Sequence, residues 1–239
     1  RASQLGFKTA IVEKESLGGV CLNWGCIPTK ALLKSAQVFE YLKHADDYGL
    51  TIKEYDKDFD AVINRSRNVA KGMSKGVQFL MKKNNIDIIE GHGKILPDKR
   101  ISVTKNKKTT EYKSQHIIIA TGARSREIQS LPQDGKKIIG YREAMTLSKQ
   151  PKKLVVVGSG AIGIEFAHFY NAMGTDVTIV EYLNRIVPVE DEEVSKQLER
   201  SFSNNGINVL TGTEVKSVDT KGKEIKVTLK TNKGEEIIT

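Results

Sequence analysis

The chain has 239 residues with 38 Lys and Arg against 29 Asp and Glu, so its formal net charge is +9 at pH 7. Its 38% hydrophobic content, without an apolar run near 18 residues, favours a soluble chain over a membrane span. Aromatic residues make up only 6% and do not alternate with the lysines, which indicates a solvated basic surface rather than a nucleic-acid site.

The two cysteines lie in residues 18–30, Gly-Gly-Val-Cys-Leu-Asn-Trp-Gly-Cys-Ile-Pro-Thr-Lys. Pro28 suits the first position of a helix, and the helix formers that follow predict one from there. Cys26 would then lie beside a helix N-terminus, whose partial positive charge favours a thiolate. The flanking glycines allow a small Cys21–Cys26 ring, and because short rings restrict the unfolded chain little, such a bridge suits redox chemistry better than structural stapling.

Three other interpretations of the pair stay open. A structural disulfide is disfavoured because two cysteines are too few for a disulfide scaffold and no signal peptide is expected. A zinc site is disfavoured because no histidine lies near the pair in sequence. Two unrelated buried cysteines would not explain the glycines and the Ile-Pro-Thr-Lys run around them.

The rest of the first half alternates between helix and strand patterns. We predict a helix from Phe59 to Asn84, short strands at 86–90 and 100–104, and a return strand at 117–120. The predicted domains are residues 1–123, a connecting segment 124–151 with Pro132, Gly135 and Pro151, and residues 152–239.

The second half opens with an apolar strand at 153–157, a Gly-x-Gly-x-x-Gly loop and a helix through about Met173, the context of a dinucleotide-binding unit. The loop residues are Gly158, Gly160, Ala161, Ile162 and Gly163. A second strand ends at Glu181, which suits a ribose with a free 2′-hydroxyl and favours NAD over NADP, although nearby Arg185 keeps NADP open. A further helix is predicted from Glu190 to Asn204.

The chain contains an internal repeat. Residues 5–13 match residues 173–181, since both combine a helix end, a glycine C-cap and a strand that closes on glutamate. Residues 85–91 and 206–212 also match. The repeat predicts an α/β fold of two Rossmann-like, three-layer β/β/α domains, each incomplete here. We expect a strand and phosphate loop before Arg1 and a last strand after Thr239.

Two such units joined to a Cys-x4-Cys pair resemble the pyridine nucleotide-disulfide oxidoreductase family over the whole chain. The motif of residues 18–30 is most similar to the members that oxidise dihydrolipoamide. The resemblance implies that the first unit binds FAD and the second NAD. It implies that Cys26 is the flavin-side thiol, that Cys21 is the interchange thiol, and that Lys30 lies near the flavin with Glu165 as its carboxylate partner.

The resemblance also assigns cofactor contacts outside the cysteine motif. These are Glu13 to the ribose of the FAD adenosine, Gly93 to its adenine end, Thr121, Gly122 and Ala123 as the second flavin-domain signature, and Val215 to the adenine pocket of NAD. The family's catalytic His–Glu pair, its late flavin-binding Gly-Asp motif and its C-terminal dimerisation domain are expected beyond Thr239. No histidine here is assigned to catalysis, and no metal site is predicted.

The implied reaction passes electrons from dihydrolipoamide through the Cys21–Cys26 disulfide and FAD to NAD⁺. The implied partners are dihydrolipoamide or the lipoyl domain of a 2-oxo acid dehydrogenase complex, and a second copy of the full-length chain in a homodimer. A bacterial cytoplasm or a mitochondrial matrix would suit a catalytic disulfide. The alternatives are an NADP-dependent disulfide or mercuric reductase and a non-catalytic binding module, and we expect the 239 residues alone to be inactive.

Overall fold

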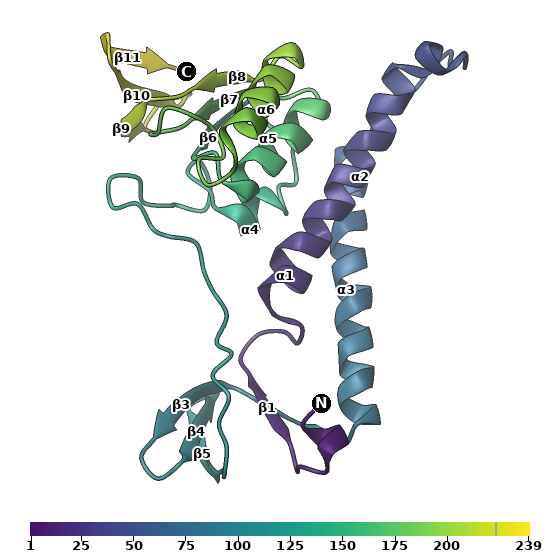
Figure 1. The fold of residues 1–239 in the computed structure, drawn as a ribbon, viewed down its shortest axis with the longest axis vertical. Coiled ribbons are helices and arrows are strands. Elements are labelled where there is room, and N and C mark those ends of the chain that lie inside the picture. The colour runs from purple at the N-terminus through teal and green to yellow at the C-terminus, as the bar shows by residue number, and fades with distance from the viewer. Residues whose placement is uncertain (223) are drawn as a thin grey trace. The chain divides into compact units, whose positions relative to one another are not determined.

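The computed structural model describes residues 1–222 and 224–239 (Figure 1). The chain divides into two compact units. Unit 1 comprises Arg1–Pro28 and Arg67–Arg124, and unit 2 comprises Thr29–Ser66 and Ser125–Thr239. Residues 29–66 therefore group with the second half of the chain. The domain boundaries expected from the sequence stay a prediction.

The first half of the chain contains five strands and five helical segments. In chain order they are η1 (Ser3–Leu5), β1 (Ala10–Glu13), α1 (Gly19–Trp24), α2 (Cys26–Lys43), η2 (Ala45–Tyr48), α3 (Phe59–Lys83), β2 (Asp87–Glu90), β3 (His92–Leu96), β4 (Arg100–Lys105) and β5 (Lys108–Lys113). Helix α3 begins where the Asp58 carboxylate accepts the Ala61 N–H at 2.9 Å, a typical N-cap. Its residues Ile63 and Ser66 are buried at the spacing of one helix face.

The second half of the chain also contains both helices and strands. They are α4 (Tyr141–Ala144), β6 (Lys153–Val157), α5 (Ala161–Ala172), β7 (Asp176–Val180), α6 (Glu192–Asn204), β8 (Asn208–Leu210), β9 (Glu214–Asp219), β10 (Lys226–Thr231) and β11 (Gly234–Ile238). Asp191 caps α6, because its side chain accepts the N–H of Glu193 at 2.8 Å.

In unit 1, β1 and β2 form a parallel pair, and β3, β4 and β5 form an antiparallel sheet. The two layers approach closely at Gly93 of β3. A Cβ added there would lie 3.1 Å from Cγ1 of Val12 on β1. A side chain at this position would press against the neighbouring strand, so glycine permits the close packing.

Unit 2 has the three layers expected of a β/β/α fold. The parallel sheet β6-β7-β8 packs on one face against helices, through a core that includes Phe169, Tyr170 and Ile179. Its other face contacts the antiparallel sheet β9-β10-β11 through Val180, Val227 and Leu229. The strands carry nearly continuous apolar residues because both faces of the parallel sheet are covered.

The two units repeat one order of elements. In each, a parallel strand pair (β1-β2, β7-β8) is followed along the chain by a three-stranded antiparallel sheet. The strands β1 and β7 also begin after equivalent glycines, Gly6 with φ +88° and Gly174 with φ +90°, both in the left-handed region that favours glycine. The predicted α/β class and the internal repeat are confirmed.

Some predicted elements differ in the structure. The return strand predicted at 117–120 is wrong: these residues form no strand, and the side chains of Ile118 and Ile119 are 85% and 69% exposed. A strand needs a neighbour to supply its backbone hydrogen bonds, and no described strand pairs with this segment. Helix α2 begins at Cys26 rather than Pro28. Proline is tolerated there because N–H groups of a first turn have no partner within the helix.

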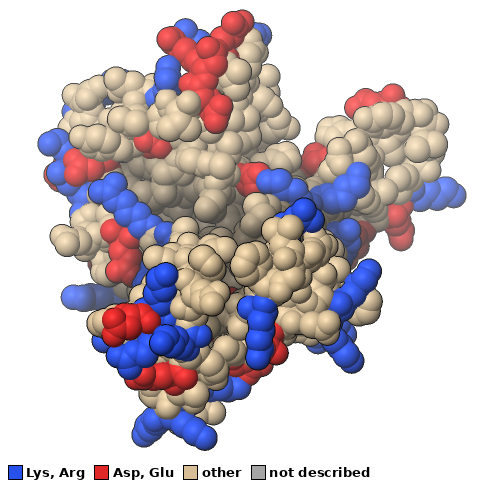
Figure 2. Space-filling view, turned by 60° about the horizontal axis from the view of Figure 1, so that its bottom comes forward, with Lys and Arg blue, Asp and Glu red and all other residues tan. Residues whose placement is uncertain are grey.

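The positive charge is distributed among acidic residues. On the face shown in Figure 2, Lys and Arg side chains lie among Asp, Glu and uncharged residues. Lys105 pairs with Glu90, Arg100 with Glu111, and Lys196 with Glu192. Such exposed pairs add little stability because water and salt screen their charges. We infer that these pairs mainly balance charge locally.

Leu229→Ala tests the contact between the two sheets of unit 2. Leu229 is fully buried, and its truncation is expected to lower the free energy of unfolding by about 2–5 kcal/mol because it leaves a cavity. Ile237→Ala on β11 is the matched control, since that side chain is 62% exposed. Denaturant unfolding of the full-length protein measures both, and equal losses would contradict the packing described.

Candidate functional site

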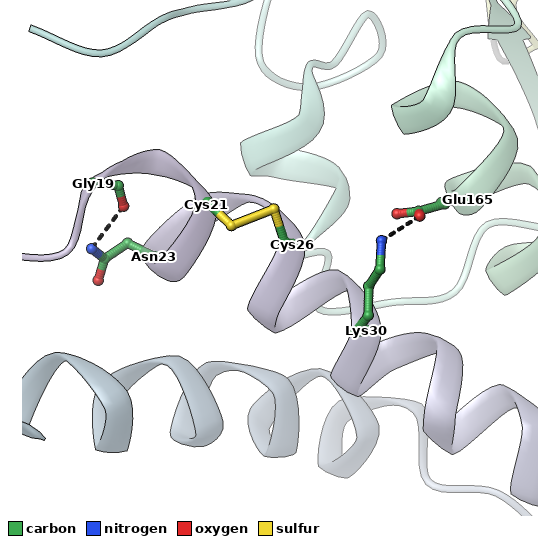
Figure 3. Close-up of a disulfide and its surroundings, with 6 residues drawn as sticks. All are labelled: Gly19, Cys21, Asn23, Cys26, Lys30 and Glu165. Carbon is green, nitrogen blue, oxygen red and sulfur yellow. Dashed lines mark hydrogen bonds and ion pairs between the residues drawn. A yellow bond between two sulfur atoms is a disulfide. The ribbon is translucent and has the colours of Figure 1, made fainter. Parts of the chain in front are cut away.

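The two cysteines lie on either side of a break between two helices. Cys21 belongs to α1 and Cys26 is the first residue of α2. Their sulfurs form a disulfide, with the two Cα atoms 4.8 Å apart (Figure 3). The predicted bridge is therefore present.

Glycines lie at both ends of α1. Gly18 and Gly19, where α1 begins, have φ values of +105° and +71°, in the left-handed region. At Gly25, in the break between α1 and α2, a Cβ would lie 3.0 Å from Cα of Cys21 and 3.1 Å from the carbonyl oxygen of Val20. Because both neighbours are backbone atoms, a larger residue would require a small backbone shift beside Cys21.

The position of Cys26 at the start of α2 sets its chemistry. The N–H groups of a first helical turn have no partner within the helix and carry partial positive charge. When the disulfide is reduced, this charge favours the thiolate of Cys26 over its thiol. Cys21 lies in the first turn of α1, which has only 6 residues against the 18 residues of α2.

Lys30 and Glu165 form an ion pair between α2 and α5 (Figure 3). The Lys30 side chain is 61% exposed, so the pair adds little stability. Lys30 also lies one turn beyond Cys26 on the same helix. The structure brings together the lysine and the carboxylate that the family resemblance connects, and their role toward a flavin stays a prediction.

The Gly-x-Gly-x-x-Gly loop connects β6 to α5. A Cβ at Gly163 would lie 2.3 Å from the carbonyl oxygen of Gly158, so only glycine lets the helix approach the loop this closely. A Cβ at Gly158 or Gly160 would meet no atom within 4 Å. The loop is therefore open on the side where the first N–H groups of α5, from Ala161 and Ile162, have no partner within the helix. This arrangement suits a phosphate group.

Glu181 follows β7 and is only 7% exposed. One carboxylate oxygen accepts the N–H and the hydroxyl of Ser159, at 2.9 and 2.6 Å. The other oxygen accepts the N–H of Leu183 at 2.9 Å. Burial acts to raise the pKa of Glu181, but these hydrogen bonds outweigh it and hold the pKa below its ordinary value. The carboxylate is therefore ionised at neutral pH.

Ser159 connects Glu181 to a strained residue. Val187 has φ +40°, which is unusual for a β-branched residue, and its N–H contacts the Ser159 hydroxyl oxygen at 3.1 Å. Sequence reasoning missed Ser159 because a serine between two glycines has no pattern of its own. Its hydroxyl nevertheless joins the phosphate loop to the acid at the end of the next strand.

Only some of the residues expected to contact FAD lie in regular secondary structure. Glu13 ends β1, and its carboxylate accepts the N–H of Glu15 at 2.8 Å. Gly93 lies on β3, where it packs against β1. Thr121, Gly122 and Ala123 lie in an exposed segment without regular structure. Their contacts with FAD stay predictions.

Val215 of β9 pairs with Leu229 of β10 and packs against the core between the two sheets of unit 2. Its position explains a packing role, and the adenine contact stays a prediction. A second residue missed from the sequence is Arg67 of α3, which contacts the segment between the cysteines. Arg67 lies 44 residues from Asn23 along the chain, so no local sequence pattern connects the two residues.

Within residues 1–222 and 224–239, no group of three or more His, Cys, Asp and Glu is arranged to hold a metal ion. In the same part of the chain, no helix combines the length and apolar character that a membrane crossing requires.

Comparison with known proteins identified one family. The family model described as pyridine nucleotide-disulphide oxidoreductase matches residues 1–239. The dihydrolipoyl dehydrogenase of Rhizobium etli is 46% identical over 250 residues, which cover 98% of this chain and 52% of that protein. The mitochondrial dihydrolipoyl dehydrogenase of Pisum sativum is 39% identical, with 99% and 48% covered. The chain spans about half the length of the curated relatives it matches.

Solved structures share the fold. The crystal structure of LpdA from Mycobacterium tuberculosis superposes with a TM-score of 0.87 at 25% identity, covering 97% of this chain and 50% of that chain. The HOCl-induced flavoprotein disulfide reductase RclA of Escherichia coli gives a TM-score of 0.83 at 23% identity, with 98% and 50% covered. The second comparison supports the fold alone.

Ser159→Ala tests the buried Glu181 carboxylate. Because hydrogen bonds hold the pKa of Glu181 below its ordinary value, the ionised group stabilises the fold near pH 7, and this contribution is lost as the pH falls through the lowered pKa. The variant is expected to lose about 1–3 kcal/mol of unfolding free energy at pH 7 and less under acidic conditions. Denaturant unfolding at several pH values measures it. Ser203→Ala, on an exposed position of α6, is the control, and a loss independent of pH would contradict the assignment.

Proposed function

Since this chain belongs to the pyridine nucleotide-disulphide oxidoreductase family, we propose that it is part of a dihydrolipoyl dehydrogenase that oxidises dihydrolipoamide with reduction of NAD⁺. The observation that carries the proposal is the Cys21–Cys26 disulfide at the start of α2, in a chain that also has a dinucleotide-type loop at Gly158–Gly163. The relatives that bear this name match nearly the whole chain. These relatives support dihydrolipoamide as the class of substrate, and this part of the proposal rests on them rather than on the geometry of the site.

The cysteine pair accepts electrons by thiol–disulfide exchange. A thiolate of dihydrolipoamide attacks the sulfur of Cys21, the Cys21–Cys26 bond breaks, and Cys26 leaves as a thiolate. The second substrate thiol then attacks the substrate sulfur of the mixed disulfide, which releases Cys21 and closes the lipoamide disulfide. Two electrons move to the cysteine pair, and two protons leave the substrate thiols.

The start of α2 favours this order of events. The leaving sulfur is Cys26, and a thiolate leaves faster when its pKa is low. The unpaired N–H groups of the first turn lower the energy of that thiolate. In this proposal Lys30 provides a positive charge one turn from Cys26, and Glu165 orients its ammonium group.

The residues present fit the two cofactors that the proposal requires. The open Gly158–Gly160 loop and the first turn of α5 would hold the pyrophosphate of NAD, and Glu181 would face its ribose. Glu13, at the equivalent end of β1, would face the ribose of FAD. When bound, FAD would supply the two-electron chemistry that connects the reduced cysteine pair with NAD⁺.

The partners and location follow from the same proposal. The substrate would be free dihydrolipoamide or a lipoyl domain of a 2-oxo acid dehydrogenase complex, and the full-length protein would be a homodimer. A bacterial cytoplasm or mitochondrial matrix fits the relatives named above. We propose that residues 1–123 form an FAD-binding domain and that residues 152–239 form an NAD-binding domain, with residues 124–151 joining the two.

Cys26→Ser in the full-length flavoprotein tests the roles of the two sulfurs. We expect the long-wavelength absorbance of a thiolate–flavin contact to be lost on partial reduction, because the thiolate nearest the flavin is removed. Cys21→Ser is the matched control and is expected to keep that absorbance while losing dihydrolipoamide oxidation. A band that survives in Cys26→Ser and disappears in Cys21→Ser would reverse the assignment.

The NAD preference has its own test. The ionised Glu181 carboxylate would repel the 2′-phosphate of NADP. The guanidinium of Arg185, the group that would attract this phosphate, donates instead to the carbonyl oxygen of Pro188 at 2.9 Å. We expect kcat/KM of the full-length enzyme to favour NAD⁺ by about a hundredfold, a difference of about 2.7 kcal/mol. Glu181→Gln, which removes the charge but keeps the side-chain size, is expected to narrow the ratio. A preference of the parent enzyme for NADP⁺ would contradict the proposal.

A further inference from the structure

The side chain of Arg67 contacts the peptide between the two cysteines. Arg67 of α3 donates from Nη2 to the carbonyl oxygen of Asn23 at 2.8 Å. Its guanidinium carbon lies 4.1 Å from the centre of the Trp24 ring, a cation–π distance. Asn23 and Trp24 are consecutive residues inside the Cys21–Cys26 ring, so one side chain holds the middle of that ring from another helix.

The same peptide is held on its other sides. The Trp24 indole N–H donates to the Glu15 carboxylate at 2.9 Å. The buried Asn23 side chain donates to the carbonyl oxygens of Leu17 and Gly19, both at 3.0 Å, and Figure 3 shows the second of these bonds. These contacts do not involve the sulfur atoms. They can therefore persist when the disulfide is opened.

Arg67 occupies its position at a cost. Its Nη1 is buried and has no hydrogen-bond partner among the described residues. Burial lowers the pKa of Arg67, although an arginine remains charged at neutral pH. A buried, incompletely paired polar group of this kind is unfavourable by itself and requires an explanation. The Asn23 carbonyl and the Trp24 ring, which Arg67 contacts, both lie between the cysteines.

We propose that Arg67 is a positioning residue of the redox pair, which keeps the peptide between Cys21 and Cys26 in its ring-closed geometry after the disulfide has been reduced. This inference rests on the proposed function, in which the pair is reduced and re-formed in each cycle. It concerns a residue outside the cysteine motif, on a helix that contributes neither sulfur.

The effect on the redox equilibrium has a definite sign. When a dithiol reduces the pair, two electrons and two protons pass to Cys21 and Cys26 while the donor sulfurs join in a disulfide. In the oxidised protein the covalent ring itself restricts residues 22–25. In the reduced protein only noncovalent contacts do so. Loss of Arg67 therefore gives conformational freedom mainly to the reduced form and shifts the equilibrium toward the dithiol.

The test uses the full-length flavoprotein equilibrated in mixtures of dihydrolipoamide and lipoamide of set ratio. Alkylation followed by mass spectrometry of the peptide that contains both cysteines gives the fraction in the disulfide form. Arg67→Met, which keeps an apolar stem, is expected to shift the equilibrium about tenfold toward the dithiol, which corresponds to about 30 mV. Arg67→Lys keeps the charge but loses the planar group, and is expected to show a smaller shift.

Arg65→Met is the matched control. Arg65 lies on the same helix and donates to the carbonyl oxygen of Ala31 at 2.7 Å, outside the ring. We expect its equilibrium to equal that of the parent. Should Arg67→Met not accumulate as folded flavoprotein, Trp24→Leu removes the stacked ring, keeps Arg67, and is expected to shift the equilibrium in the same direction.

The outcomes separate this inference from the proposed function. If the parent pair exchanges with dihydrolipoamide and the folded Arg67 and Trp24 variants keep its equilibrium, the positioning role is wrong. An equal shift in Arg65→Met would also overturn it, because the effect would then belong to α3 as a whole. If the parent pair does not exchange with the dithiol, the proposed function fails instead.

Discussion

The close approach of Gly25 to the backbone of Cys21 is the constraint on which the cysteine pair depends. A Cβ at this position would lie 3.0 and 3.1 Å from two backbone atoms, so glycine lets the chain break between α1 and α2 without a backbone shift. This break places Cys26 at the first position of a helix and leaves Cys21 in the preceding one. Cys26 begins a helix of 18 residues, whereas Cys21 lies in one of 6 residues. We propose that the longer helix favours the Cys26 thiolate and so gives the disulfide a direction of exchange.

A similar backbone contact organises the nucleotide loop of unit 2. Gly163 approaches the Gly158 carbonyl so closely that α5 starts directly at the carboxyl end of β6. The neighbouring parallel strand ends at the same edge, which brings Glu181 to Ser159. Both candidate sites of this chain thus depend on glycines that allow a helix start to approach the backbone before it.

Local patterns in the sequence were sufficient to predict some of these features. The glycine caps at Gly6 and Gly174, the parallel strands and the disulfide all follow from residues close together in the chain. The strand at 117–120 was predicted from its apolar run alone, and it is absent because no described strand pairs with it. Ser159 and Arg67 could not be predicted, because a side chain that bridges loops or helices leaves no periodicity in the sequence.

The charged groups of the two candidate sites differ in their exposure to water. The less exposed groups are suited to holding the geometry of a site, and the more exposed ones to responding to a change of charge. Glu181 is buried and accepts backbone N–H groups, and Arg67 is half-buried and donates to a backbone carbonyl oxygen, so moving either one would leave unpaired donors or acceptors. Lys30 and Glu165 form a partly exposed pair that water can replace at small cost. A group that must answer a change of charge during electron transfer benefits from such a pair, because its ammonium can reorient without disrupting the fold. In the proposed function Lys30 is therefore the group that responds to charge, and Arg67 is the one that keeps the sulfurs in place.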